Sequence, residues 1–262
     1  MSRHVLVIGG HGKIAQLLTP ILLKRSWTVT SMIRTQEQAA TIEALGKGQA
    51  GKLNVLVSSL EDVQDEAQAK SILDKVKPDY VVWSAGAGGR GGPDRTLRID
   101  RDICINFINA AAATPTVTRF LLISYVGSRR AKPSWWDGAA WDAAQEVNNG
   151  ALKTYYQAKI ASDEALYRAS RARRDFAGIN LRPGTLTTEP AGAIELGKTA
   201  TSRGQSSRAT VAEVAALLLE KGGVKNCWLD LLDGKDDRQA AVDRCVKEGV
   251  DAAEGEPVFT EK

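Results

Sequence analysis

Residues Val5–Ala15 read VLVIGGHGKIA, and this stretch decides the fold. The apolar run Val5–Ile8 predicts a buried strand, and the glycine-rich turn Gly9–Ala15 follows it directly. A tight strand-to-helix turn needs glycine where φ is positive and where the backbone approaches a pyrophosphate. The N–H groups that begin the next helix then face the phosphates. The stretch therefore predicts a dinucleotide-binding loop, although a plain tight turn has the same glycines.

Strand-like and helix-like segments alternate along the rest of the chain. Continuous apolar runs, unlike alternating ones, are typical of parallel strands that are covered on both faces. Further runs of this kind are Thr28–Ile33, Leu53–Val57, Tyr80–Ser84, Phe120–Ser124, Gly178–Leu181 and Asn226–Leu232. Helical patterns between them span Ile14–Lys24, Asp65–Lys75, Arg98–Ala113, Thr154–Arg173 and Thr210–Glu220. We predict an α/β fold of the Rossmann type, with a doubly wound, mainly parallel sheet in a single domain over residues 1–262.

Three segments interrupt this alternation and are predicted to be loops. They are the glycine-rich residues 86–93, the long connection 129–150 and the polar connection 185–208. In doubly wound folds, ligands bind outside the carboxyl ends of the strands, where such loops gather. We therefore expect 129–150 and 185–208 to line the substrate side.

Two further features concern helices. Pro20 falls inside the first predicted helix, where proline removes a hydrogen bond, so the helix either bends there or ends at Leu18 and restarts. The end of the chain is predicted to form a helix over Arg238–Lys247 and then to fray.

The composition of the chain limits which classes of binding partner can be expected. With 43% hydrophobic and 25% charged residues, the chain can bury a sizeable core. The net charge of +4 is dispersed, and the tightest basic cluster has the spacing of a solvated helix face, so no nucleic-acid partner is expected. That cluster comprises Arg168, Arg171, Arg173 and Arg174.

Cysteine and histidine are too sparse for several kinds of site. The 3 cysteines are widely spaced and the 2 histidines, His4 and His11, flank the first strand, so we expect neither a metal site nor a disulfide framework. No apolar run reaches the roughly 20 residues that span a bilayer. We expect a cytoplasmic protein without a membrane partner, either a monomer or a homodimer.

The end of the second predicted strand indicates which dinucleotide is bound. An acidic residue there would bond the ribose 2′-hydroxyl of NAD. Ser31–Arg34 instead ends in a guanidinium, and no acidic residue follows before Glu37. Because a planar guanidinium suits a phosphate, Arg34 predicts NADP(H), the alternative being a surface arginine before a helix.

A second motif, Tyr155-Tyr156-Gln157-Ala158-Lys159, places Tyr155 and Lys159 one helical turn apart on the same face. A cation beside a tyrosine favours the phenolate, which lets the hydroxyl exchange a proton with a substrate oxygen. Such a pair is common on helix surfaces, but downstream of a dinucleotide loop it predicts a proton-transfer site.

These motifs together resemble an atypical short-chain dehydrogenase/reductase, of the branch with NAD(P)-binding, NmrA-like and biliverdin-reductase-B-like members. The resemblance spans nearly the whole chain. Beyond the two motifs above, it is carried by Val82–Ala87, Asp100–Ala111, Arg119–Ser124 and Leu181-Arg182-Pro183-Gly184.

The resemblance implies particular contacts. Ala85 and Gly86 would line the adenine ribose, Leu60 would lie near the adenine, and Pro183 and Gly184 would cup the nicotinamide, with Thr185 or Thr187 beside them. With the residues argued above, the predicted cofactor-binding set is Gly9, Gly10, His11, Gly12, Lys13, Ile14, Arg34, Leu60, Ser84, Ala85, Gly86, Lys159, Pro183 and Gly184.

The resemblance also implies the catalytic set Tyr155, Lys159 and Ser124, although this chain departs from the family's pattern at several positions. The family's active-site serine is usually the second of a serine pair, and here that pair reads Ser124-Tyr125, with Ser128 as an alternative. Asp100 stands where relatives often carry asparagine, and Ser59 where many have aspartate.

The predicted function is an NADP(H)-dependent oxidoreductase that acts on a carbonyl or alcohol of a small, apolar or aromatic substrate. The alternatives are an NADP(H) sensor without hydride transfer and a redox-neutral isomerase or dehydratase. Trp135, Trp136 and Trp141 either face the ligand or pack their loop onto the domain. Arg129 and Arg130 either steer an anionic group or are ordinary surface arginines.

Overall fold

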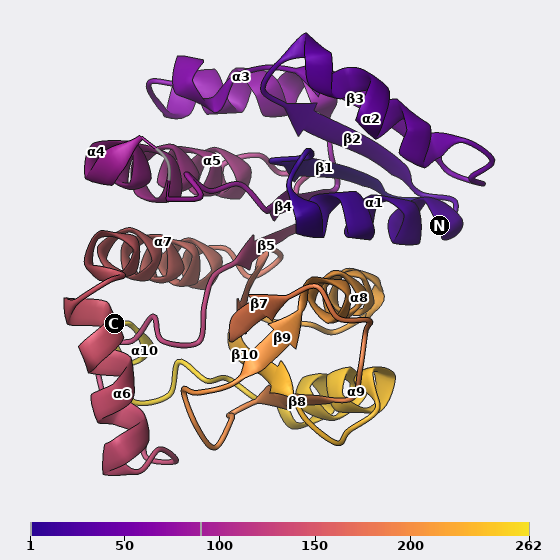
Figure 1. The fold of residues 1–262 in the computed structure, drawn as a ribbon. Coiled ribbons are helices and arrows are strands. Elements are labelled where there is room, and N and C mark those ends of the chain that lie inside the picture. The colour runs from indigo at the N-terminus through magenta and orange to yellow at the C-terminus, as the bar shows by residue number, and fades with distance from the viewer. Residues whose placement is uncertain (1, 90, 262) are drawn as a thin grey trace.

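The computed structural model describes residues 2–89 and 91–261, and its centre is one eight-stranded sheet (Figure 1). The strand order is β3-β2-β1-β4-β5-β6-β10-β8, and every neighbouring pair is parallel except β10 and β8. The bounds are β1 His4–Ile8, β2 Thr28–Ile33, β3 Lys52–Val57, β4 Tyr80–Trp83, β5 Arg119–Ile123, β6 Ala177–Pro183, β10 Cys227–Asp233 and β8 Ile194–Gly197. The predicted doubly wound, mainly parallel sheet in a single domain is confirmed.

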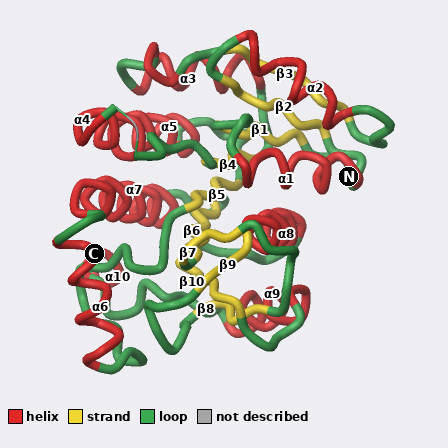
Figure 2. Tube along the Cα trace, in the orientation of Figure 1, coloured by secondary structure: helices red, strands yellow, loops and turns green. Residues whose placement is uncertain are grey.

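Helices cover both faces of this sheet (Figure 1, Figure 2). Val5 and Val7 of β1 point to the core under α1 and α8, whereas Leu6 and Ile8 point to the core under α3, α5 and α7. Both faces of the sheet are therefore buried from solvent, and this explains why the strands appear in the sequence as continuous apolar runs. The helices are α1 Lys13–Lys24, α2 Ala39–Glu43, α3 Glu66–Val76, α4 Gly92–Leu97, α5 Cys104–Ala112, α6 Gly138–Asn149, α7 Lys153–Ala172, α8 Arg208–Glu220, α9 Arg238–Glu248 and α10 Pro257–Thr260. Within the described part of the chain, none of them is long and apolar enough to cross a membrane.

The two predicted substrate-side loops contain regular structure that the prediction missed. Residues 129–150 include α6, and residues 185–208 include β7 (Thr185–Thr187), β8 and β9 (Gln205–Ser207). β7 and β9 pair in parallel as a small second sheet. These strands are 3 and 4 residues long, so they carry too little periodicity to be read from the sequence.

Two predictions about helices are corrected. Helix α1 continues through Pro20 to Lys24, so the predicted restart after Leu18 is wrong. The prediction that the chain frays after Lys247 is also wrong, because Pro257–Thr260 form α10 and Ala252, Ala253 and Val258 are completely buried.

A fully buried set of charges joins the carboxyl-end segments of the central strands. The Arg129 guanidinium contacts one oxygen of Asp230 at 2.5 Å and the Arg182 guanidinium contacts the other at 3.0 Å. Arg182 also donates to the carbonyl of Ser128 at 2.6 Å and stacks over Trp228 at 4.2 Å. The set therefore fixes the segment after β5 against β6 and β10, directly beside Ser124.

Removal of one charge from this set tests how much the set contributes to the stability of the fold. Asp230 is the carboxylate that both guanidiniums contact, and without it Arg129 would keep the more distant Glu256 at 3.5 Å and Arg182 the more distant Asp163 at 3.7 Å. Because this leaves two buried cations with weaker compensation, Asp230→Asn should lower the free energy of unfolding by about 3–5 kcal/mol. Urea denaturation measures it, with Asp74→Asn as the control, since the exposed Lys70–Asp74 pair should contribute about 0.5 kcal/mol. Equal losses in the two variants would contradict the interpretation.

Candidate functional site

The glycine loop forms a cradle in which side chains have no room. Gly9 has φ +82°, and a Cβ there would lie 2.6 Å from the Cα atom of Ala85. A Cβ on Gly10 would lie 1.8 Å from the Ser31 Oγ atom. The loop is thereby pressed between the ends of β2 and β4, next to the junction of β1 and β4 where the chain changes winding direction.

The start of α1 is open toward this cradle. Gly12 is the N-cap residue, and among the described residues no side chain caps the helix. Its first-turn N–H groups and the positive end of its dipole are therefore available to phosphate. A dinucleotide pyrophosphate fits this arrangement of close-packed glycines and uncapped helix.

A cavity of about 560 Å³ extends from the loop toward the edge strands and suits the adenosine half of such a ligand. Leu60 and Ala85 line it, and Arg34 and Lys13 expose their cations at its edge. The Arg34 backbone N–H is fixed by Gln38 Oε1 at 3.0 Å. The remaining lining residues are Gly9, His11, Gly12, Met32, Ile33, Gln38, Ser58, Ser59, Glu61, Ser84, Gly86, Ala87, Gly88, Arg95 and Ile99.

A second cavity, of about 680 Å³, continues from Ser84 and Gly86 toward α7. Tyr155 and Lys159 of α7 line it together, and the Lys159 ammonium donates to the Ile123 carbonyl at 2.7 Å. Burial raises the pKa of Tyr155, while Lys159 acts in the opposite direction. Burial alone would lower the pKa of Lys159, but the nearby Tyr155 and carboxylates leave it raised. Lys159 is thus a buried cation beside a tyrosine that is protonated at neutral pH.

Asp100 adds a buried carboxyl group to this cavity. It lies in a π-helical turn, Arg98–Ile103, a kind of helix defect that is frequent at functional sites. Its Oδ2 atom accepts the Ala87 N–H at 2.9 Å, and burial raises its pKa although Lys159 is near. The Asp100 side chain thereby ties the loop that follows β4 to this π-helical turn.

A third cavity, of about 600 Å³, shares Leu152, Tyr155 and Leu186 with the second and lies on the substrate side. Ser124 and Tyr125 line it. The Ser124 hydroxyl donates to the buried Asp163 carboxyl at 2.8 Å. The Tyr125 ring lies 5.2 Å from the Tyr155 ring. The three cavities therefore form one cleft along the carboxyl ends of the strands.

Most of the residues predicted for the site line this cleft. Gly10 is the exception among the cofactor set, since it is buried against Ser31. The cleft also brings together Ile14, Ser84 and Lys159 in its middle and Pro183, Gly184 and Thr185 on the substrate side. Ser128 is fully buried, so it offers no hydroxyl to the cleft.

The aromatic and basic residues of segment 129–150 have mainly structural contacts. Arg129 is fully buried in the ion-pair set, so both predictions for it are wrong. Arg130 pairs with Glu164. Trp136 is buried and donates to the Thr199 carbonyl at 2.8 Å, and Trp135 and Trp141 pack beside it. The packing alternative therefore holds for Trp136.

Several cleft residues were not identified from the sequence. Asn148 of α6, Leu186 of β7 and the pair Arg203 and Arg208 line the substrate cavity. They lie in segments read as irregular loops, and no motif marks them. They line the cleft only because the fold brings α6, β7 and residues 203–208 beside it.

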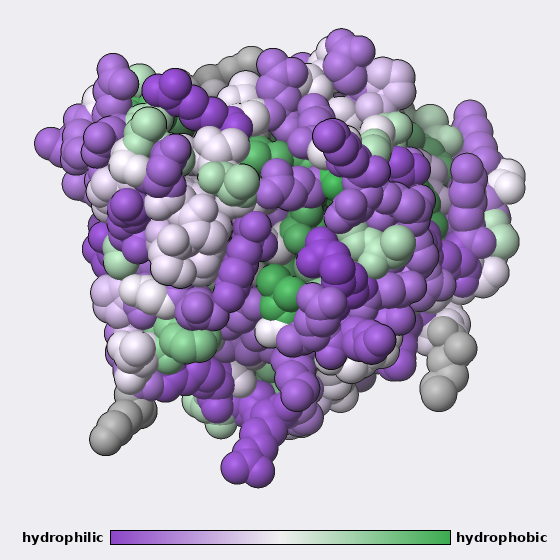
Figure 3. Space-filling view, turned by 90° about the horizontal axis from the view of Figure 1, so that it is seen from below, coloured by the Kyte–Doolittle hydropathy of each residue, from purple (hydrophilic) through white to green (hydrophobic). Residues whose placement is uncertain are grey.

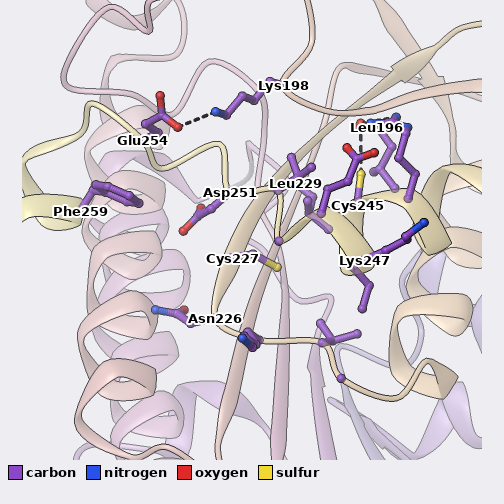
Figure 4. A pocket seen from close by; sticks show the side chains of 18 of the residues that line it. Leu196, Lys198, Asn226, Cys227, Leu229, Cys245, Lys247, Asp251, Glu254 and Phe259 are labelled. Atoms are coloured by element: carbon purple, nitrogen blue, oxygen red, sulfur yellow. Dashed lines mark hydrogen bonds and ion pairs between the residues drawn. The ribbon is translucent and has the colours of Figure 1, made fainter.

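A cavity of about 970 Å³ lies elsewhere, between the start of β10 and the end of α9 (Figure 4). The Lys198–Glu254 ion pair, at 2.6 Å, lies at its edge, and Cys227 and Cys245 line it, with the Cys245 thiol donating to the Leu196 carbonyl at 3.4 Å. Burial raises the pKa of Cys245 to about 11, so this thiol is protonated at neutral pH. Among the described residues, this cavity shares no lining residue with the cleft.

The face of the molecule that Figure 3 presents has a narrow apolar strip among polar side chains.

Comparison with known proteins identifies a family. A family model described as NAD(P)H-binding matches residues 9–221. A Bacillus subtilis protein, YhfK, named as an uncharacterised sugar epimerase, is 30% identical over 237 residues, which is 88% of this chain and 94% of that protein.

Solved structures share the fold. A Bacillus halodurans protein, provisionally named as an NAD-dependent epimerase/dehydratase, superimposes with a TM-score of 0.75 at 24% identity, covering 93% of this chain and 100% of the other. The Lactococcus lactis oxidoreductase ylbE has a TM-score of 0.70 at 21% identity, with 93% and 97% covered. At these identities the likeness concerns the fold alone.

The close contact at Gly9 makes a testable prediction. Both Gly9→Ala and Gly48→Ala place a side chain at positive φ, +82° and +70°, so each should lose about 1 kcal/mol of stability from backbone strain. Gly48 has open space around it, whereas at Gly9 the new methyl group meets Ala85. Only Gly9→Ala should weaken NADPH binding, by tenfold or more in titration calorimetry. Unchanged affinity in Gly9→Ala would show that the cradle does not bind the cofactor.

Proposed function

This chain belongs to the NAD(P)H-binding family, and from that premise we propose that it is an NADP(H)-dependent oxidoreductase that acts on a carbonyl or alcohol of a small substrate. The observation that carries the proposal is the position of Tyr155 and Lys159. Tyr155 lines both the second and the third cavity, and Lys159 lines the second cavity beside it, so a proton can be exchanged at the place where the cofactor and the substrate would meet.

The chemistry follows from the protonation states of this pair. When bound, the nicotinamide supplies the hydride to the carbonyl carbon during reduction. Tyr155 is protonated at neutral pH because burial raises its pKa, so it can donate its proton to the carbonyl oxygen and complete the alcohol. Lys159, a buried cation, stabilises the phenolate that remains.

The walls of the substrate cavity support a small and partly apolar substrate. Tyr125, Val126, Leu152 and Leu186 form its apolar and aromatic surface. Such a surface excludes water and binds flat or aliphatic groups, while a few polar atoms orient them. Arg203 and Arg208 line the same cavity.

A redox-neutral reaction on the same site is the second candidate, because a 30%-identical relative is named as a sugar epimerase. In that case the hydride would return to the substrate within one turnover. The two candidates differ in a simple observable, since only net reduction changes the absorbance of the nicotinamide stoichiometrically.

The preference for NADP(H) rests on the cations at the edge of the adenosine-side cavity. Arg34 and Lys13 are both exposed there, and the described lining residues include a single carboxylate, Glu61, which pairs with Arg95 at 2.9 Å. A 2′-phosphate would therefore meet uncompensated positive charge.

Loss of the Tyr155 hydroxyl tests the reaction. Tyr155→Phe should lower kcat for NADPH-dependent reduction of a probe carbonyl, 4-nitrobenzaldehyde, by about 100-fold or more, because positioned proton transfer contributes about 10²–10⁴-fold. NADPH affinity should stay within about threefold. Tyr156→Phe is the matched control, since that hydroxyl only donates to the Arg129 carbonyl at 2.9 Å. Full turnover in Tyr155→Phe would exclude the assignment.

The choice of dinucleotide has its own test. Arg34→Ala should reduce the ratio of NADPH to NADH affinity by about tenfold or more, because a charge-assisted hydrogen bond contributes about 1.5–3 kcal/mol. Fluorescence titration with both cofactors measures this ratio. Arg174→Ala, which removes an exposed arginine that does not line the cleft, should leave the ratio unchanged. An unchanged ratio in Arg34→Ala would remove the basis for NADP(H).

A further inference from the structure

The hydrogen-bond direction at Tyr125 is fixed by its neighbours. The Asn148 Nδ2 group donates to the Gly127 carbonyl at 2.8 Å, and a carbonyl oxygen can only accept. The other end of the same amide, Oδ1, therefore faces the Tyr125 hydroxyl and accepts its hydrogen. Asn148 is 1% exposed, so water does not compete for these bonds.

The Tyr125 oxygen consequently offers the substrate cavity lone pairs and no hydrogen. Burial raises the pKa of Tyr125 far above its ordinary value, so the hydroxyl keeps its proton. A carbonyl oxygen of a substrate cannot form a hydrogen bond with this tyrosine oxygen, because both atoms are acceptors. A substrate hydroxyl, which carries a hydrogen, can bond it.

Tyr125 and Tyr155 are placed to contact one small molecule. Their rings are 5.2 Å apart and both line the substrate cavity. Gly127 allows this placement, since a Cβ there would lie 2.8 Å from the Tyr125 ring. An oxygen that exchanges a proton with Tyr155 and a hydroxyl that meets Tyr125 would therefore lie close together in one small molecule.

We infer that the substrate carries a further hydroxyl group close to its reacting carbon, and that Tyr125 selects for this group by accepting its hydrogen bond. The inference rests on the proposed function and narrows its substrate class to hydroxy-carbonyl compounds and diols. An ammonium group would also donate, but its burial against Val126 and Leu186 costs far more than burial of a neutral hydroxyl.

A pair of alcohols that differ by one hydroxyl tests the inference. The probes are cyclohexanol and cis-cyclohexane-1,2-diol, each oxidised with NADP⁺, and the measured quantity is the ratio of their kcat/KM values. The wild-type protein should prefer the diol by about tenfold, the size of one net hydrogen bond. Tyr125→Phe keeps the ring but removes the acceptor. It should bring the ratio close to 1, mainly by raising KM for the diol.

The controls separate this inference from the proposed function. Tyr156→Phe should keep the diol preference, and Tyr155→Phe should lose turnover of both alcohols. A wild-type ratio near 1, or a preference that survives in Tyr125→Phe, overturns the inference while the oxidoreductase assignment stands. If the wild-type protein oxidises neither alcohol, ligand-observed NMR on the NADP⁺-loaded protein decides instead. Tighter binding of the diol that is lost in Tyr125→Phe supports the inference, and equal binding of both alcohols overturns it.

Discussion

The buried contact of Arg129 and Arg182 with one carboxylate, Asp230, is the constraint on which the substrate half of the molecule depends. The three charges are fully buried, and the next carboxylates lie farther away, Glu256 at 3.5 Å from Arg129 and Asp163 at 3.7 Å from Arg182. Separation of the three would therefore weaken the compensation of charge in a low-dielectric interior. The contact joins the segment after β5 to β6 and β10. It thereby determines where Ser124 and Tyr125 stand relative to α7, and with them the shape of the cleft.

The cofactor half could be predicted from the sequence because its determinants are local. Val5–Ile8 is buried on both faces and reads as apolar without interruption, and the glycines that follow are required by contacts within the same turn and with the adjacent strand ends. Tyr155 and Lys159 are likewise neighbours on one helix, so spacing alone places them together.

The substrate half could not be predicted, because its determinants are distant in sequence. Arg129 and Asp230 are 101 residues apart, and nothing near Arg129 distinguishes a buried arginine from an exposed one. The orientation of Tyr125 depends on an asparagine in α6, a helix within a segment that reads as a loop. The predicted serine is present at Ser124, but only the structure shows its hydroxyl bonded to Asp163.

Residues 252–256 hold the segment that follows β5 in place. Glu256 accepts the backbone N–H groups of Arg130 and Ala131, and the Ala252 carbonyl accepts from Arg129. The dinucleotide cradle, by contrast, is built from strands and turns of the first hundred residues. On the ribosome, where earlier residues emerge first, the cradle can therefore assemble early, whereas the substrate wall gains this support only once residues 252–256 have been made. The order of translation thus separates in time the two functions that the finished cleft combines.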